Sequence, residues 1–202
     1  MEYLVLGFFT GLSLILAIGA QNIFVIEQGL KKQYLLLVCL ICSISDLILI
    51  FLGIFLFHYF VQYFNSTIEL ILNILLIIFL IHFIYSKIKS YNSKVEFNRE
   101  TQDVSKFDIF LKTLGFTYLN PHVYSDTVFF LGNFSKNFVF SDKILFGVGA
   151  SLASFLFFFL IGYLSKYLSH YAKSEKVWKI INLFIIIFMS MLTIFVILET
   201  IN

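Results

Sequence analysis

The chain has 202 residues, of which 60% are hydrophobic and 13% are charged, and its mean hydropathy is +0.94. A soluble domain carries about 25% charged residues, so this composition excludes one and indicates an all-α integral membrane protein. The net charge of +2 gives no reason to expect a nucleic-acid partner.

Six apolar windows have the length of roughly twenty residues that is needed to cross the hydrocarbon core of a bilayer. They cover residues 3–26, 34–57, 68–86, 109–131, 144–165 and 178–199. We expect each window to be a transmembrane helix, with the lipid bilayer as its surroundings.

The positive residues predict how these helices are oriented. All Lys and Arg residues except Lys136 and Lys143 lie in or beside the loops that follow the first, third and fifth windows. Because loops rich in Lys and Arg stay in the cytoplasm, both termini are predicted to lie outside. The protein is then a multi-pass membrane protein, and because its abundance of Phe, Ile, Lys and Asn indicates a bacterial source, we expect it in a bacterial cell (inner) membrane.

Residues 87–108 form the one long polar stretch and are expected to be a cytoplasmic linker. The linker divides the chain into two three-helix repeats, 1–86 and 109–202. An odd number of helices in each half forces the halves into opposite orientations, which is the inverted-repeat plan of many secondary transporters.

The first helix of each half is predicted to be interrupted, at Gly19–Asn22 and at Asn120-Pro121. Asn caps the free N–H groups at a helix start, and Pro121, the only proline, suits the first helical position. Such a break is tolerated in lipid only where it faces protein or a watery cavity. We therefore expect half-helices that begin after Asn22 and Asn120, with N-terminal dipoles suited to an anionic group.

Two carboxylates lie inside the apolar windows. Asp46 is in the middle of the second window, which has no Lys, Arg or His between Leu35 and Phe57, and Asp126 is in the second half of the fourth. A buried charge of this kind is costly, so a functional role is the default interpretation. The alternatives are a protonated Asp46 bonded to a neighbouring helix and a helix-end position for Asp126.

Small residues form stripes at helical spacing in the first, second and fifth windows, which predict close helix packing or, in the fifth window, a cavity wall. The stripes are Gly7 and Gly11; Cys39, Ser43, Asp46 and Gly53; and Gly147, Ser151, Ser154, Gly162 and Ser165. Glu27 and Gln28, at the end of the first window, are expected to be a solvated helix end.

Half-helix N-termini at one end of a site and aspartates at the other fit an amino acid, and a basic one would use both acids. The candidate substrate-binding residues are Gln21, Asn22, Ser43, Asp46, Asn120, His122 and Asp126, with Gly19 and Pro121 at the helix breaks. His122 could relay a proton or bond within the break. A proton is a candidate coupling ion, a homo-oligomer is a candidate assembly, and no cofactor or metal is expected.

These residues lie in blocks that resemble the LysE-type amino-acid exporters, particularly the branch that exports basic amino acids. The blocks are Gly19–Asn22, Glu27–Gly29, Ile44–Leu47 with Gly53, Leu119–Thr127, Ala153–Phe155 and Ile180–Leu183. The resemblance implies export of L-arginine or L-lysine, driven by the membrane potential or a proton gradient, with Asp46 and Asp126 as the acid pair. Ala20 departs from the family pattern, which usually has proline there.

Three other functions are weighed against this one. The solute could be a neutral amino acid or another small cation. Cys39 and Cys42 have the C-x-x-C spacing of a thiol-electron carrier but lie within an apolar run, which favours buried small residues. Neither Gly-x-Ser-Gly nor His-Glu-x-x-His occurs, so an intramembrane hydrolase, or any enzyme, is not expected.

Overall fold

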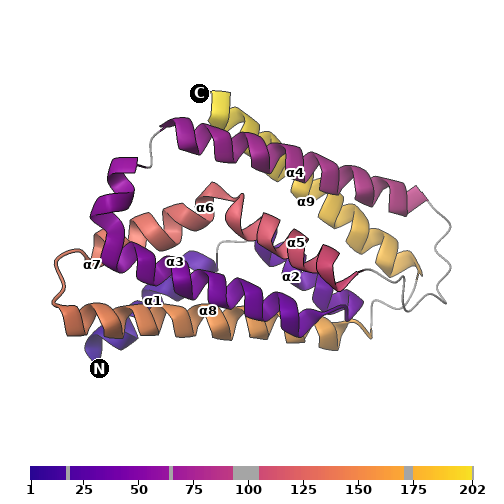
Figure 1. The fold of residues 1–202 in the computed structure, drawn as a ribbon. Coiled ribbons are helices and arrows are strands. Elements are labelled where there is room, and N and C mark those ends of the chain that lie inside the picture. The colour runs from indigo at the N-terminus through magenta and orange to yellow at the C-terminus, as the bar shows by residue number, and fades with distance from the viewer. Residues whose placement is uncertain (17–18, 64–65, 93–104, 171–174, 202) are drawn as a thin grey trace.

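The computed structural model describes residues 1–16, 19–63, 66–92, 105–170 and 175–201, and the regular elements in these ranges are helices (Figure 1). They are α1 (Glu2–Ile15), α2 (Ala20–Lys31), α3 (Leu35–Tyr63), α4 (Ser66–Asn92), α5 (Lys106–Tyr118), α6 (Pro121–Tyr124), the π-helix η1 (Ser125–Phe130), α7 (Leu131–Ser135), α8 (Phe140–Leu168) and α9 (Glu175–Ile201). The predicted all-helical class is confirmed.

Four of the described helices are long and apolar enough to cross a membrane. The spans are Leu35–Phe57 in α3, Leu70–Lys89 in α4, Phe140–Leu168 in α8 and Lys179–Leu198 in α9. The pair α1 and α2, whose axes differ by 83°, would make a fifth span if the two are taken together. The protein is therefore a multi-pass membrane protein.

The predicted window 109–131 is not among these spans, because the chain there is divided among α5, α6, η1 and α7. The six-span arrangement accordingly stays a prediction. The predicted linker 87–108 is partly helical: α4 continues to Asn92 and α5 begins at Lys106. Residues 93–104 of that linker lie outside the described residues.

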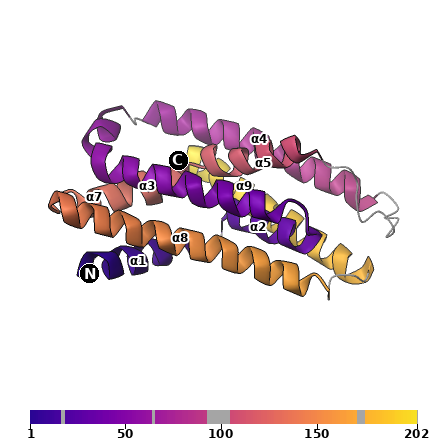
Figure 2. The same cartoon turned by 60° about the horizontal axis from the view of Figure 1, so that its bottom comes forward.

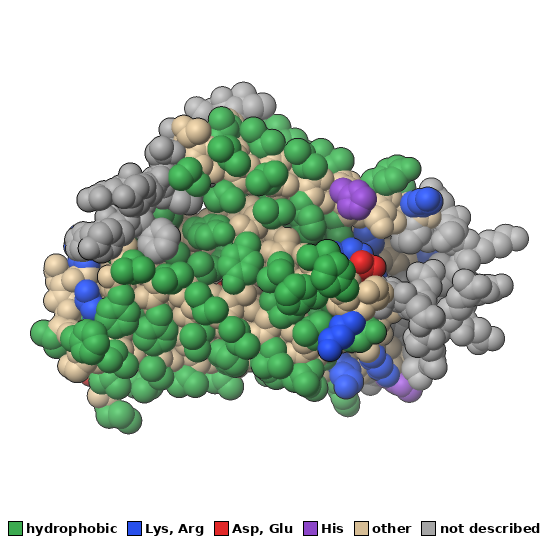
Figure 3. All heavy atoms as spheres, in the orientation of Figure 1, with side chains coloured by type: hydrophobic (Ala, Val, Ile, Leu, Met, Phe, Trp, Pro, Cys, Tyr) green, Lys and Arg blue, Asp and Glu red, His purple; other side chains and the backbone are tan. Residues whose placement is uncertain are grey.

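The surface matches a protein surrounded by lipid. Apolar side chains cover the long middle of the face in Figure 3, and Lys and Arg side chains gather at the ends of the molecule. Figures 1 and 2 show that α2, α4 and α8 end, and α5 and α9 begin, at the same end. We call it the lysine-rich end, after Lys31, Lys87, Lys106 and Lys166.

Glycines let the first half of the chain pack closely on the second. A Cβ at Gly7 would collide with the backbone carbonyl of Phe146, and a Cβ at Gly149 would collide with that of Leu4. A Cβ at Gly11 would lie 2.9 Å from the Cα of Ala150. The Gly7–Gly11 pair thus serves helix packing between α1 and α8.

A second close contact joins α3 to the η1–α7 segment. A Cβ at Gly53 would lie 2.6 Å from the Cα of Val128, and one at Gly132 would lie 2.7 Å from the carbonyl oxygen of Gly53. In addition, α3 packs against α8, and α4 packs against α9. The helices of the two halves are therefore interleaved.

Candidate functional site

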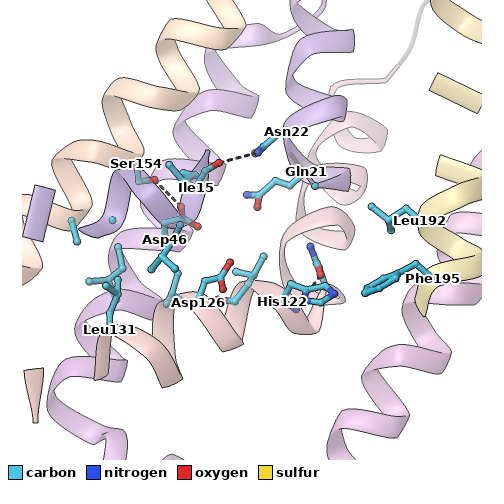
Figure 4. A pocket seen from close by; sticks show the side chains of 18 of the residues that line it. Ile15, Gln21, Asn22, Asp46, His122, Asp126, Leu131, Ser154, Leu192 and Phe195 are labelled. Atoms are coloured by element: carbon cyan, nitrogen blue, oxygen red, sulfur yellow. Dashed lines mark hydrogen bonds between the residues drawn. The ribbon is translucent and has the colours of Figure 1, made fainter. Parts of the chain in front are cut away.

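A cavity of about 540 Å³ lies where α1, α2, α3, α6, η1, α7, α8 and α9 meet (Figure 4). Its lining residues are Gly11, Leu14, Ile15, Gly19, Gln21, Asn22, Asp46, Ile50, Asn120, His122, Val123, Asp126, Thr127, Leu131, Ala150, Ser154, Phe188, Met191, Leu192 and Phe195. The cavity therefore brings both interrupted regions together with both aspartates.

Asp46 reaches the cavity from α3 and is 6% exposed. Ser154 of α8 donates a hydrogen bond from its Oγ to Asp46 Oδ2 at 2.7 Å. A hydroxyl bonded to a carboxylate both satisfies that oxygen and fixes its direction. The small-residue stripe of α8 thus supplies one polar side chain to the cavity.

Asp126 reaches the same cavity from the π-helix η1 and is half-buried. Figure 4 shows its carboxylate turned into the space that Asp46 also faces. Single π-turns within helices are frequent at functional sites. Asp126 lies well inside the α6–η1–α7 segment, so the helix-end alternative does not describe it.

The helix start at Asn120 agrees with the sequence prediction. The Asn120 side-chain oxygen accepts a hydrogen bond from the His122 N–H at 3.1 Å, and Pro121 occupies the first position of α6. Asn120 and His122 line the cavity, whereas Pro121 is buried and only sets the helix start. The His122 ring stacks on Phe195 of α9, with ring centroids 6.2 Å apart.

The prediction that a half-helix begins after Asn22 is wrong. The helix α2 begins at Ala20, with Gly19 in extended conformation as its N-cap, so Asn22 lies in the first turn. Asn22 Nδ2 instead donates to the Ile15 carbonyl at 3.2 Å, at the end of α1 (Figure 4). That carbonyl is one of the last four of α1, which have no partner within their own helix.

Two other expectations change. Ser43 is completely buried and does not line the cavity. Glu27 and Gln28 are buried rather than solvated, because Glu27 is paired with Lys31 and Lys87. The pairing supplies the positive charge that a buried carboxylate requires.

The thiols are enclosed by helix packing. Cys39 and Cys42 are both completely buried, and the Cys39 thiol donates to the Phe158 carbonyl at 3.4 Å. A Cβ at Gly162 would lie 2.9 Å from the Cys39 sulfur. Thiols in such a position are poorly placed for exchange with a partner.

The charge of the cavity follows from its lining. The described residues that line it include two aspartates and no lysine or arginine, and His122 is the only one that can become positive. Gln21, the other polar side chain from α2, donates to Thr117 Oγ1 at 3.1 Å. The arrangement can hold a cationic group in a space that is otherwise mostly apolar.

Comparison with known proteins identifies the family. The sequence model of the LysE type translocator family matches residues 12–200. The chain is a member of the LysE type translocator family. A LysE-type translocator is a transporter and not an enzyme.

Relatives of this LysE-type translocator carry the name arginine exporter protein ArgO. One from Pectobacterium carotovorum subsp. carotovorum is 34% identical over 181 residues, covering 89% of this chain and 88% of the relative. One from Salmonella paratyphi A is 31% identical over 186 residues, covering 92% and 88%. No solved structure matches the chain significantly.

Sequence reasoning did not assign a role to Ser154, Leu192 or Phe195. Ser154 was visible only as one member of a stripe, and nothing in the sequence distinguishes the serine that faces Asp46. Phe195 and Leu192 are apolar residues in an apolar window, and nothing in the sequence distinguishes them from the other apolar residues there. Their place in the cavity depends on how α9 packs.

Proposed function

We propose that this LysE-type translocator exports the basic amino acids L-arginine and L-lysine from the bacterial cytoplasm. The observation that carries the proposal is that Asp46 and Asp126 line one cavity to which no lysine or arginine contributes among the described residues. Two carboxylates without a fixed cation nearby select a positively charged solute. A negatively charged or neutral solute would leave the negative charge of the carboxylates without a partner.

The cavity also offers a complement to the substrate's own carboxylate. Gly19, Gln21 and Asn22 line it at the start of α2. The first N–H groups of a helix have no intrahelical acceptor and face outward at its positive end, which favours an anion. A basic amino acid would lie with its carboxylate near this helix start and its cationic side chain toward the aspartates.

The names of the relatives agree with a basic amino acid as the solute. The ArgO proteins that match about nine-tenths of this chain are named arginine exporters. At 31–34% identity this supports a basic amino acid as the solute.

We propose further that the chain is an inverted repeat with halves 1–86 and 109–202. The broken segment α1–α2 packs on α8 of the other half, and the broken segment α5–α7 packs on α3. The pairs α3 with α8 and α4 with α9 close the arrangement. Exchanging the halves leaves these main contacts unchanged, which supports a chain of two related halves.

The lysine-rich end is proposed to face the cytoplasm, which leaves both termini outside. Moving one positive charge outward against a potential that is negative inside costs about 2.3 kcal/mol per 100 mV. Coupling the export of arginine to an opposing flow of cation would offset this cost. A proton that moves inward on Asp46 or Asp126 would provide this flow.

Counterflow in proteoliposomes tests the proposed function. Vesicles loaded with arginine should take up labelled arginine or lysine, and Asp46→Asn and Asp126→Asn should each abolish that uptake in protein that remains folded. Asp108→Asn is the matched control, because Asp108 is an exposed carboxylate outside the cavity. Equal exchange of leucine, or full activity of both cavity variants, would favour a neutral amino acid as the solute.

A further inference from the structure

The helix α2 connects the cavity to the lysine-rich end. Gln21, in its first turn, lines the cavity, and Lys31 is its last residue. At 1.5 Å per residue, Glu27 lies about 9 Å along the helix axis from Gln21. The helices that face α2 over this distance therefore decide whether the cavity communicates with that end.

Four aromatic rings fill the space immediately beyond Gln21, and we call them the phenylalanine layer: Phe24, Phe79, Phe83 and Phe116. The Phe116 ring lies 4.7 Å from Phe24, 4.7 Å from Phe79 and 5.0 Å from Phe83, measured between ring centroids. They come from α2, α4 and α5, and Phe24 and Phe116 are almost completely buried. Within the layer, the three helices are joined by ring contacts alone.

One helical turn further along α2, an ion pair follows the phenylalanine layer. Lys87 Nζ of α4 lies 2.5 Å from Glu27 Oε1, and it lies 3.5 Å from Asn182 Oδ1 of α9. Glu27 is 1% exposed and Lys87 is 7% exposed. Glu27 Oε2 has no hydrogen-bond partner among the described residues.

Removing charged groups from water can cost more free energy than their mutual attraction returns. The pair is therefore poorly explained as a device for stability alone, and both groups would be well solvated if the helices separated and water entered. A contact whose net free energy is small can open and close, which is what a switching element requires.

We propose that the Glu27–Lys87 pair and the phenylalanine layer form a gate that closes the cavity toward the lysine-rich end, and that the pair must separate for solute to pass. The inference deepens the proposed function, since it concerns the path of the solute that function assigns to the cavity. It requires no particular solute.

Lys31 provides a matched control within the same cluster. Its Nζ also lies 2.5 Å from Glu27 Oε1, but it belongs to α2 itself, four residues further on. Removing Lys31 leaves the connection from α2 to α4 in place. Removing Lys87 breaks that connection, while Lys31 still neutralises Glu27.

The test measures access to the cavity from each side of the membrane. Cys39→Ala and Cys42→Ala first remove the native thiols. In this background, Leu192→Cys places a thiol at the cavity. In a separate protein with the same background, Lys32→Cys marks the lysine-rich side. A small membrane-impermeant cationic methanethiosulfonate is then applied to either side of vesicles without solute. From the side that labels position 32, we expect position 192 to be labelled slowly. Adding Lys87→Met should make the labelling of position 192 several-fold faster, and adding Lys31→Met should leave its rate unchanged.

Rescue separates gating from general loosening of the fold. The exchange Glu27→Lys with Lys87→Glu should restore slow labelling, since opposite charges again join α2 to α4. If Lys87→Met does not yield monodisperse protein, Lys87→Gln replaces it. The same two results are then expected: faster labelling with the single variant and slow labelling with the charge exchange. Labelling that is unchanged by loss of Lys87, or equally fast with Lys31→Met, would overturn the gate.

The result is independent of the solute's identity. If counterflow shows leucine instead of arginine, the proposed function fails and the labelling rates keep their meaning. If the labelling rates do not depend on Lys87, the gate fails and the aspartates can still select a basic amino acid.

Discussion

At the scale of single residues, Ser154 fixes the direction in which Asp46 faces. Its hydroxyl lies 2.7 Å from Asp46 Oδ2, and both side chains line the cavity. A hydrogen bond to a charged group contributes about 1.5–3 kcal/mol. We predict that Ser154→Ala raises the KM for arginine counterflow roughly tenfold, the equivalent of about 1.4 kcal/mol, while the maximal rate changes less.

Ser151 is the control for this substitution. It lies on the same helix, is also buried, and its hydroxyl has no hydrogen-bond partner among the described residues. Removing an unsatisfied buried hydroxyl is nearly neutral or stabilising. A KM for Ser151→Ala as high as that for Ser154→Ala would contradict the role given to Ser154.

The two aspartates could be predicted from sequence because a carboxylate within an apolar span is costly to bury and therefore points to a functional site. Their neighbours could not. Ser154 is 108 residues from Asp46, and its bond to Asp46 depends on the packing of α3 against α8. Glu27 was misjudged because Lys87, its partner, comes from another helix.

At the scale of elements, glycines set the distance between α1 and α8. A Cβ at Gly7 would collide with backbone atoms of Phe146, which cannot move like the end of a side chain. Overpacking of this kind costs about 1–3 kcal/mol. Gly7→Ala should therefore lower the midpoint of thermal unfolding in detergent.

Gly19 makes a matched comparison, because a Cβ there would meet nothing within 4 Å. Its φ of −112° is open to any residue. Gly19→Ala replaces only an N-cap residue and is accordingly expected to lower the midpoint less than Gly7→Ala does. Equal midpoints for the Gly7 and Gly19 variants would show that the α1–α8 contact is not as close as described.

Hydropathy alone was enough to predict the four long helices, since each is a continuous apolar run. The break at Asn120-Pro121 was also predictable, because its capping chemistry is local. The π-helix η1 was not, as its sequence Ser125–Phe130 carries no local signal for a wider turn. The start of α2 at Ala20 was misplaced because Asn22 bonds backward to α1 instead of capping α2.

At the scale of the whole molecule, interleaved packing places two breaks and two aspartates around one cavity. Each broken segment packs on the long helix that follows the broken segment of the other half. The charge of the cavity is thus a property of the assembled fold, and it leads to a prediction about solutes rather than about any one side chain.

Competition between L-arginine and L-citrulline tests that prediction most directly. The two amino acids have nearly the same shape and the same backbone groups, but the citrulline side chain is neutral. In vesicles that exchange labelled arginine, unlabelled arginine and lysine should compete strongly and citrulline weakly. Citrulline that competes as well as arginine would contradict the claim that Asp46 and Asp126 recognise the charge of the solute.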